Sequence, residues 1–492
     1  MVFSSFLFLY FFLPLCIFFY FIVPKKLKNL SLLISSLFFY AWGTFEFFPI
    51  FLASSLIDFI IANIIFKSNT YINFKNFKIS KNKFWLTTGI ILNILLLGYY
   101  KYSNFFIHEL NSFLVSIDFT KTSWNKVVLP IGISFITFQK ISYLIDVYRK
   151  EVKPASNFFN YLLYVALFPQ LIAGPIVKYK DIAKQINDRK IVLNNILNGA
   201  VRFCMGLSKK VLLADTLGNV VNNVDRLSEA SITTGYAWLG VICYGLQMYF
   251  DFSGYSDMAI GLGKIFGFNF LENFNKLFAS QTFTEFWRRW HISLQRFMKD
   301  YLYIPLGGNR VSKLRSYINL WIVFLVSGFW HGANWTYIFW GAYHGLFLTI
   351  DKLGWYKKSE NLGKTFLGKM FNTFLTLFFM QISWVIFKSK SMHEVFKYLG
   401  YMFNVSKYSV PQIYPLQGRI IHSEAKFILL ISIIIIIYHI LFTENERIIN
   451  RLKKLSIINN PIIKFTYCLL TLFICTAILS ASKFSPFIYF QF

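Results

Sequence analysis

The stretch that decides the fold is INLWIVFLVSGFWHGANWTYIFWGAYHGLFLTI, residues 318–350, in which no Asp, Glu, Lys or Arg occurs. As one straight helix its 33 residues would extend about 50 Å, whereas the hydrocarbon core of a bilayer is about 30 Å thick. We therefore expect the run to break, and Gly328, Gly332 and Asn334 mark the place. His331 lies at this break, and an ionisable side chain at membrane depth is a candidate for function because its desolvation is costly.

The composition of the whole chain also indicates a membrane protein. Hydrophobic residues make up 56% of the chain, Phe alone occurs 59 times, and charged residues are 15%, against about a quarter in soluble proteins. The net charge of +28 is typical of basic loops that face an anionic cytoplasmic leaflet. Because the cations separate apolar spans and form no single patch, we expect membrane lipid as a partner and no nucleic acid.

Apolar stretches close to the 20 or so residues that cross a bilayer recur along the chain. They lie at about 3–23, 30–42, 47–66, 85–106, 127–148, 199–214, 235–263, 318–350, 366–387, 425–442 and 462–482. We interpret the first as an uncleaved span, because Lys25, Lys26 and Lys28 follow it and no basic residue precedes it. The apolar segment 158–176 contains two prolines and precedes another basic loop, so we expect it to be re-entrant. The sequence predicts an all-α polytopic protein with about 10–11 transmembrane helices plus re-entrant and interfacial helices.

Several familiar sites are absent from the sequence. The five cysteines have neither CxxC nor zinc-ligand spacing, so we expect no metal site. The chain has no HExxH pair, no GxxxxGK[ST] phosphate loop and no GxSxG nucleophile turn. The glycines at 261, 263 and 267 miss the dinucleotide-binding spacing. We therefore expect no bound cofactor.

The histidines narrow the candidates for chemistry. Of seven, His108, His393 and His422 fall in expected loops, and we expect His439, near a span end, to extend to the interface. The remaining three, His291, His331 and His344, lie within 54 residues. A single histidine in an apolar helix is more often a satisfied core residue, but three grouped in this way favour a site.

An imidazole near its ordinary pKa can take a proton from a hydroxyl, and a second can orient it or stabilise charge on an acyl carbonyl. Acyl transfer to an alcohol therefore fits these three histidines, and their spacing alone leaves open which part each takes. Asp251 and Asp257 place two carboxylates in the apolar run 235–263. They would either bind substrate or stabilise a helix kink, and the sequence leaves both open.

The basic segment 272–316 lies just before the broken span. Its aromatic and aliphatic residues recur at near-helical spacing, so we expect an amphipathic helix along the cytoplasmic interface. Pro305, followed by a glycine pair, should end it in a turn whose free N–H groups, beside Arg310, could receive an anion. Arg288, Arg289 and Arg310 are the candidate residues for binding an anionic acyl donor.

Three stretches together resemble the membrane-bound O-acyltransferase family. They are FWRRWHISLQRFMKDYLYIPLGGNR at 286–310, SGFWHGANWTYIFWGAYHG at 327–345 and QMYFDFSGYSDMAIGLG at 247–263. The branch that looks most similar is that of the bacterial alginate O-acetylation proteins, with peptidoglycan O-acetyltransferases and teichoic acid D-alanyl transferases as relatives. The resemblance extends over most of the chain, including PIGISF at 130–135 and FPQLIAGP at 168–175.

This resemblance implies one membrane-embedded domain over 1–492, with the motif-bearing core at about 127–350 and a ring of helices around a central funnel. It implies His331 as the catalytic residue and His291 as its partner, with His344 in a supporting role. The implied donor is acetyl-CoA or another acyl thioester from the cytoplasm. The implied acceptor is an extracytoplasmic polysaccharide, most simply an alginate-like exopolysaccharide, reached through a separate periplasmic or extracellular acetyltransferase from the bacterial plasma (inner) membrane.

Alternatives remain open at this stage. Peptidoglycan O-acetylation and D-alanyl transfer to teichoic acid would use the same chemistry on another acceptor or acyl group. A carrier of an acyl donor or lipid-linked sugar, with the histidines as a proton relay, is the alternative from another class. A purely structural scaffold would leave the grouped histidines unexplained.

Overall fold

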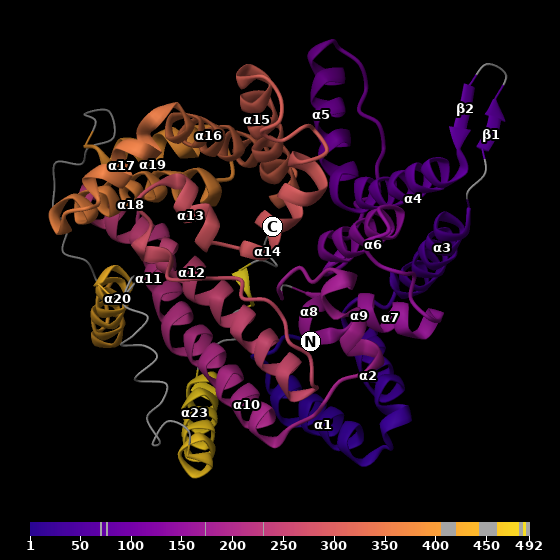
Figure 1. Ribbon diagram of the computed structural model, residues 1–492. Helices are drawn as coiled ribbons and strands as arrows, with labels where there is room; N and C mark the ends of the chain where they lie inside the picture. The colour runs from indigo at the N-terminus through magenta and orange to yellow at the C-terminus, as the bar shows by residue number, and fades with distance from the viewer. Residues whose placement is uncertain are drawn as a thin grey trace. The chain divides into compact units, whose positions relative to one another are not determined.

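The computed structural model describes residues 1–68, 71–74, 77–172, 174–229, 231–404, 420–441, 460–481 and 486–488 (Figure 1). The chain forms two compact units. Unit 1 comprises Met1–Gly199 and Ala259–Leu271, and unit 2 comprises Ala200–Met258 and Glu272–Phe492. The predicted division into one domain with a core at about 127–350 stays a prediction.

Unit 1 is built from helices and one short hairpin. Its elements are η1 (Leu7–Phe12), α1 (Leu13–Ile22), η2 (Lys25–Leu27), α2 (Lys28–Gly43), α3 (Phe48–Lys67), β1 (Tyr71–Phe74), β2 (Phe77–Ser80), α4 (Lys81–Leu97), η3 (Gly98–Tyr102), α5 (Ser103–Ser116), α6 (Ile133–Tyr148), α7 (Phe158–Ala166), α8 (Phe168–Leu171) and α9 (Tyr179–Asn187). The strands β1 and β2 pair antiparallel, with Tyr71 opposite Ser80. The hairpin is a small addition to the predicted all-α fold.

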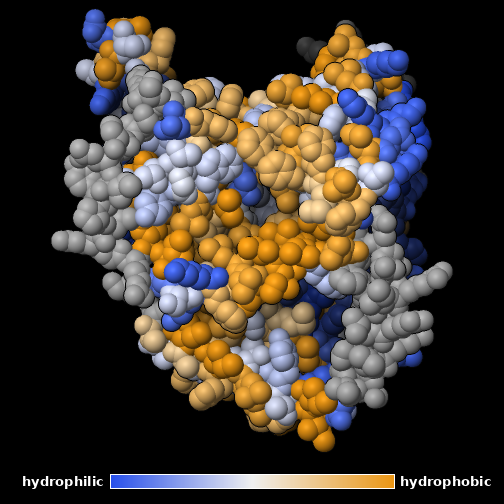
Figure 2. All heavy atoms as spheres, turned by 90° about the vertical axis from the view of Figure 1, so that its left-hand side faces the viewer, coloured by the Kyte–Doolittle hydropathy of each residue, from blue (hydrophilic) through white to orange (hydrophobic). Residues whose placement is uncertain are grey.

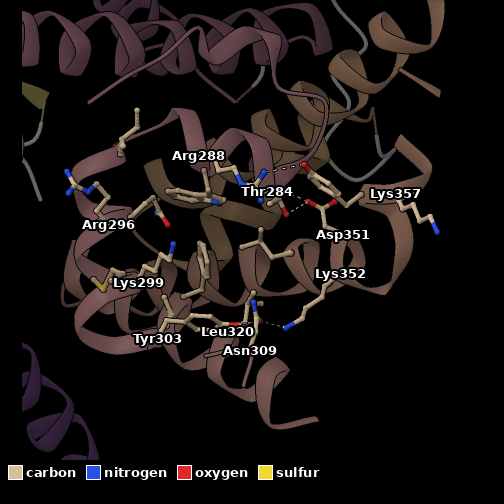
Figure 3. Close-up of a pocket in the computed structure, with 18 of the residues that line it drawn as sticks. Thr284, Arg288, Arg296, Lys299, Tyr303, Asn309, Leu320, Asp351, Lys352 and Lys357 are labelled. Carbon is tan, nitrogen blue, oxygen red and sulfur yellow. Dashed lines mark hydrogen bonds between the residues drawn. The ribbon is translucent and has the colours of Figure 1, made fainter. Parts of the chain in front are cut away.

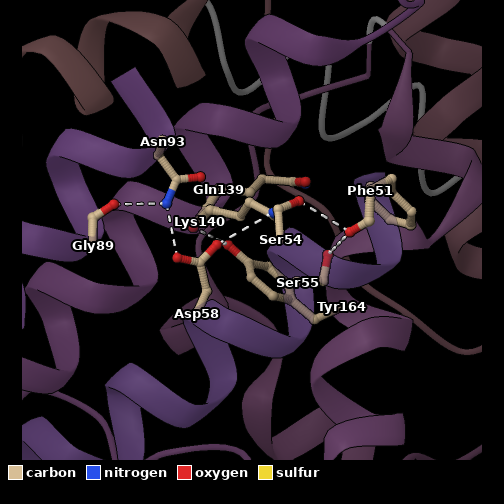
Figure 4. Close-up of polar contacts among 9 residues, drawn as sticks. All are labelled: Phe51, Ser54, Ser55, Asp58, Gly89, Asn93, Gln139, Lys140 and Tyr164. Carbon is tan, nitrogen blue, oxygen red and sulfur yellow. Dashed lines mark hydrogen bonds and ion pairs between the residues drawn. The ribbon is translucent and has the colours of Figure 1, made fainter. Parts of the chain in front are cut away.

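A buried ion pair and its hydrogen-bond partners link three helices of unit 1 (Figure 4). Asp58 of α3 pairs with Lys140 of α6 at 3.3 Å, and each side chain is at most 2% exposed. Asn93 of α4 donates to Asp58 Oδ1 at 2.8 Å, and Lys140 also donates to Ser54 Oγ at 2.7 Å. Charges taken out of water need partners of this kind, so the group specifies how α3, α4 and α6 pack.

Unit 2 carries the three histidine candidates. Its elements are α10 (Leu193–Ser208, which begins in unit 1), η4 (Lys209–Ala214), α11 (Asp215–Asp225), α12 (Thr234–Ile265, which ends in unit 1), η5 (Leu277–Ala279), α13 (Phe283–Arg289), α14 (Ile292–Met298), η6 (Lys299–Tyr303), α15 (Lys313–His331), α16 (Trp335–Ile350), η7 (Asp351–Trp355), α17 (Tyr356–Leu362), α18 (Phe366–Lys388), α19 (Met392–Met402), α20 (Ser423–Leu441) and α23 (Pro461–Ala481). Its core is aromatic, and buried Trp, Tyr and Phe side chains surround the histidines.

The chain is a multi-pass membrane protein. Among the residues that the structure describes, five helical segments are long and apolar enough to cross a bilayer: Phe48–Lys67, Lys81–Ser116, Phe366–Lys388, Ser423–Leu441 and Pro461–Ala481. Many large apolar side chains on them are exposed, and Figure 2, drawn from the side of α18 and α20, shows a broad apolar band. Apolar surface of this extent requires lipid. The all-α membrane fold is confirmed, whereas the count of 10–11 crossings stays a prediction.

The predicted spans match the helices unevenly. The expected break in 318–350 is confirmed, because α15 ends at His331 and α16 begins at Trp335. The span expected at 127–148 is helical only from Ile133. In 158–176, α7 and α8 are separated at Leu167, and neither is long enough to cross a bilayer. That this segment is re-entrant stays a prediction. The last residues of the stretches 425–442 and 462–482 lie outside the described residues.

Candidate active site

The broken span forms a tight antiparallel pair of helices. A Cβ atom on Gly328 of α15 would lie 2.2 Å from the Tyr337 carbonyl oxygen, and one on Gly341 of α16 would lie 2.4 Å from that of Phe324. Only glycine permits so close an approach of two helix backbones. The pair holds His331, the last residue of α15, close to the first turns of α16.

His331 is packed among aromatic rings. It is 6% exposed, and its imidazole centroid lies 5.1 Å from that of Trp340 and 5.2 Å from that of Phe387, both edge-on. Its neighbour Trp330 lies 4.8 Å from it and 6.3 Å from the ring of His291. Trp330 therefore contacts both histidines that the sequence proposed as catalytic. These surroundings exclude bulk water and strengthen any electrostatic interaction within them.

His291 occupies the break between α13 and α14. Its backbone is left-handed, with φ 46° and ψ 52°, a conformation that costs a non-glycine residue about 1–2 kcal/mol. The expected single helix in 272–316 is therefore wrong, since the chain turns at this residue. Strain of this kind persists only where the surrounding structure requires it, and it often marks a functional site.

The hydrogen bonds of His291 fix its tautomer. Asn273 Oδ1 accepts from the backbone N–H and the hydroxyl of Ser293, so this atom is an acceptor. His291 Nδ1 lies 3.2 Å from the same oxygen and must therefore carry the proton. Complete burial lowers the pKa of His291 to about 3, so the ring is neutral at pH 7. Its Nε2 is the basic nitrogen.

His344 has the opposite tautomer. The indole N–H of Trp287 donates to His344 Nδ1 at 3.3 Å, which places the imidazole proton on Nε2. His344 is fully buried, and its ring lies 4.5 Å from that of Trp340. Since Trp340 also contacts His331, the aromatic cluster joins His344 to the catalytic candidate. The hydrogen bond orients Trp287 against His344, and the supporting role of His344 in catalysis stays a prediction.

A cavity of about 810 Å³ opens beside this cluster (Figure 3). Its inner wall is apolar and includes Trp287, Val323, Phe324 and Leu348. Its other lining residues include five cations, namely Arg288, Arg296, Lys299, Lys352 and Lys357. A site with an apolar floor and a cationic rim fits a ligand with an uncharged arm and an anionic end.

Internal contacts hold the cavity rim in place. Arg288 donates to the Tyr356 hydroxyl at 3.2 Å and lies over that ring. Asp351, the carboxylate among the lining residues, accepts from both the N–H and the hydroxyl of Thr284 at 2.7 and 2.8 Å. Burial raises the pKa of Asp351, and these two hydrogen bonds oppose the rise. Because five cations and one carboxylate are among the lining residues, the cations dominate the field inside the cavity.

The predicted donor-binding residues have separate outcomes. Arg288 lines the cavity, whereas Arg289 and Arg310 are not among its lining residues. The glycine turn forms as expected, with positive φ at Gly307 and Gly308. However, the N–H groups of Gly307, Gly308 and Arg310 bond to carbonyls of residues 303–307. The prediction that they are free to receive an anion is therefore wrong.

Asp251 and Asp257 are ion-paired within unit 2. Asp251 lies 3.0 Å from Lys210, and Asp257 lies 2.6 Å from Arg202 and 2.7 Å from Lys209. The helix-kink alternative is wrong, because α12 runs unbroken from Thr234 to Ile265, and substrate binding stays a prediction. The two carboxylates instead hold α12 to α10 and η4.

Sequence reasoning missed some of the residues that shape the site. Lys352 and Lys357 follow the 318–350 span. Basic residues at that place are expected merely because they set the orientation of a span in the membrane, so the sequence did not mark these two as binding residues. The expectation that His439 extends to the interface is wrong, since it is 8% exposed and its ring stacks on that of Phe278 at 5.6 Å. His108 lies in α5 and His393 in α19, not in loops.

Known proteins similar to this chain show its family. The profile of the membrane-bound O-acyltransferase family matches residues 149–388. A probable alginate O-acetylase of Azotobacter vinelandii is 37% identical over the full length of both chains. One from Pseudomonas syringae pv. tomato is 42% identical over 84% of this chain and 77% of its own. A peptidoglycan O-acetyltransferase of Helicobacter pylori is 36% identical over 83% of this chain and 81% of its own. Because such identity extends over whole chains, this protein belongs to the membrane-bound O-acyltransferase family and is an O-acyltransferase.

Proposed function

We propose that this enzyme takes an acetyl group from an anionic thioester such as acetyl-CoA on the cytoplasmic side of the bacterial inner membrane. The group is destined for hydroxyls of an extracytoplasmic polysaccharide, an alginate-like exopolysaccharide first of all. A separate periplasmic or extracellular acetyltransferase completes the transfer to the glycan.

One observation carries this proposal, namely the cavity with the cationic rim beside the histidine and tryptophan cluster. Trp287 belongs to both, since it lines the cavity and donates to His344. Arg288 and Lys299 would bind the phosphates of the donor, and the apolar wall would receive the arm that bears the thioester. The acyl carbon would then arrive beside Trp340, whose ring contacts His331.

The reaction balances with histidine as the base. His331 takes the proton of the acceptor hydroxyl, the oxygen bonds to the acyl carbon, and the carbon–sulfur bond breaks. The proton then goes to the departing thiolate, so the products are an ester and a thiol. His291, neutral and fixed by Asn273, presents an unprotonated Nε2 that can accept a hydrogen bond from the acceptor hydroxyl and so orient it.

Two alternatives keep the same fold. Peptidoglycan is the acceptor in the Helicobacter pylori relative, and D-alanine in place of acetate would need only another acyl group in the same site. A carrier is the alternative from another class, and it would move the donor or a lipid-linked sugar without cleaving a thioester.

Base-labile acetate in separated exopolysaccharide and cell-wall fractions tests the proposal. We expect loss from one fraction when the native protein is replaced by His331→Ala at equal membrane abundance, and that fraction names the acceptor. His393→Ala, an exposed histidine of α19, is the matched control and should retain the native level. Unchanged acetate in both fractions with His331→Ala would refute acetyl transfer by this site and favour D-alanine or the carrier.

A further inference from the structure

Phe487 and Ile488 are buried inside unit 2 beside α12, where Figure 1 shows a short yellow stretch, and Pro486 before them is exposed. Phe487 is 1% exposed and Ile488 is 4% exposed. The backbone N–H of Ile488 donates to Asp251 Oδ2 at 2.7 Å, and Lys210 donates to the Pro486 carbonyl at 3.4 Å. Two side chains therefore hold the main chain on either side of Phe487.

The two side chains that hold this segment form a buried ion pair. Asp251 and Lys210 are 3.0 Å apart, with side chains 1% and 4% exposed, and Lys210 also pairs with Asp215 at 2.8 Å. Removing such charges from water costs several kcal/mol per ion. Their mutual attraction offsets this cost only when their remaining hydrogen-bond donors and acceptors also have partners. The Ile488 N–H satisfies one carboxylate oxygen, so the pair and the segment depend on each other.

The aromatic side chain between the two anchor points leads to His291. The ring of Phe487 lies 4.7 Å from that of Tyr255 and 6.0 Å from that of Phe252. Phe252 in turn meets the imidazole of His291 edge-on, at 4.7 Å and 89°. Asn273 holds the Nδ1 edge of the same imidazole. Phe487 therefore supports the ring that packs against a catalytic candidate.

We propose that Asp251 and Lys210 are positioning residues that clamp Pro486–Ile488, so that Phe487 keeps Phe252 packed against His291. The inference rests on the proposed function, because His291 is assigned its part in transfer there. It gives Asp251 a role that neither substrate binding nor a helix kink supplied. The clamp acts on His291 alone and leaves the cationic cavity unchanged.

The test is donor-dependent acyl transfer by Phe487→Ala and Phe487→Leu in native membranes. A ring-sized gap beside Phe252 should let the His291 imidazole move, and misplacement of about 1 Å lowers kcat by up to about 100-fold. We expect kcat to fall more than about tenfold for the alanine variant and less for leucine, with the donor KM within about twofold of native. Leucine refills most of the space, so partial rescue distinguishes positioning from loss of the fold.

Asp251→Asn provides a second measurement, because it removes the charge and keeps a side chain of the same size. We expect a lower kcat with an unchanged donor KM, as for Phe487→Ala. Phe396→Ala, an exposed side chain of α19 that is 59% exposed, is the control and should match the native protein. If the native protein transfers acyl groups and Phe487→Ala, Phe487→Leu and Asp251→Asn all match its kcat, the proposed clamp is refuted. If the native protein transfers none, the proposed function fails instead. If Phe487→Ala does not accumulate in membranes, Phe487→Leu and Asp251→Asn decide the question, and a rise in donor KM with unchanged kcat in both overturns the proposal.

Discussion

Replacing Gly341 with alanine should disable the enzyme without removing it from the membrane. The added Cβ would lie 2.4 Å from the Phe324 carbonyl oxygen, whereas ordinary contact begins at 3.4 Å, so α15 and α16 must separate by about 1.0 Å (3.4 minus 2.4). Overpacking of this kind costs about 1–3 kcal/mol in stability. A shift of 1 Å between His331 on α15 and Trp340 on α16 should lower kcat by about 100-fold.

The assay is acyl transfer by membranes with matched amounts of each variant. Gly345→Ala is the control one turn further along α16, because its Cβ would meet only the ring of Trp321 at 3.3 Å. A side chain can yield by a few tenths of an ångström, so we expect activity within about threefold of native. Native kcat in Gly341→Ala at native abundance would refute the claim that the close helix pair sets the geometry of the site.

Three further predictions concern single side chains. Since burial lowers the pKa of His291 from 6.5 to about 3, the unfolded chain binds the extra proton first, and stability present above pH 6.5 is lost as the pH falls towards 3. Between pH 7 and 5 this loss in the free energy of unfolding is about 2 kcal/mol. Thermal unfolding in detergent should show that His291→Gln loses less stability over this range than the native protein. Equal losses would contradict the lowered pKa of His291. Arg288→Gln should raise the donor KM about tenfold with little change in kcat, because it removes one charge-assisted hydrogen bond; an unchanged KM would place the donor elsewhere. Trp287→Phe keeps a ring but loses the N–H that His344 accepts, and steady-state kinetics should show kcat lowered about fivefold; native kcat would mean that this hydrogen bond has no part in positioning.

The membrane fold follows from the sequence because its physical cause is local. A run of 33 residues without Asp, Glu, Lys or Arg is too long to cross a bilayer as one helix, and Gly328 and Gly332 mark where it is weakest. The structure breaks it between His331 and Trp335. The grouping of His331 and His344 also follows, because both lie near this break on adjacent helices.

Other parts of the site depend on contacts between distant segments, which one sequence does not encode locally. The left-handed backbone of His291 is an example, because nothing in the residues around it requires positive φ, whereas contacts with distant residues such as Asn273 and Phe252 help to hold it there. Asp251 acquired its role from Lys210, 41 residues away, and from Ile488, 237 residues away. The cationic cavity gathers side chains from both ends of the 318–350 span, and charge alone did not distinguish these from orientation signals.

The most direct test of the central claim follows the acetyl group and the thiol together. Membrane vesicles that contain the enzyme, the separate acetyltransferase and the glycan receive labelled acetyl-CoA on the cytoplasmic side, and ester-linked label and released thiol are both counted. We predict one thiol per ester in the native protein, and neither product above background with His331→Gln. Equal ester formation by both proteins would contradict the role of His331. Uptake of intact donor without thiol release would show that the protein acts as a carrier and does not transfer the acyl group.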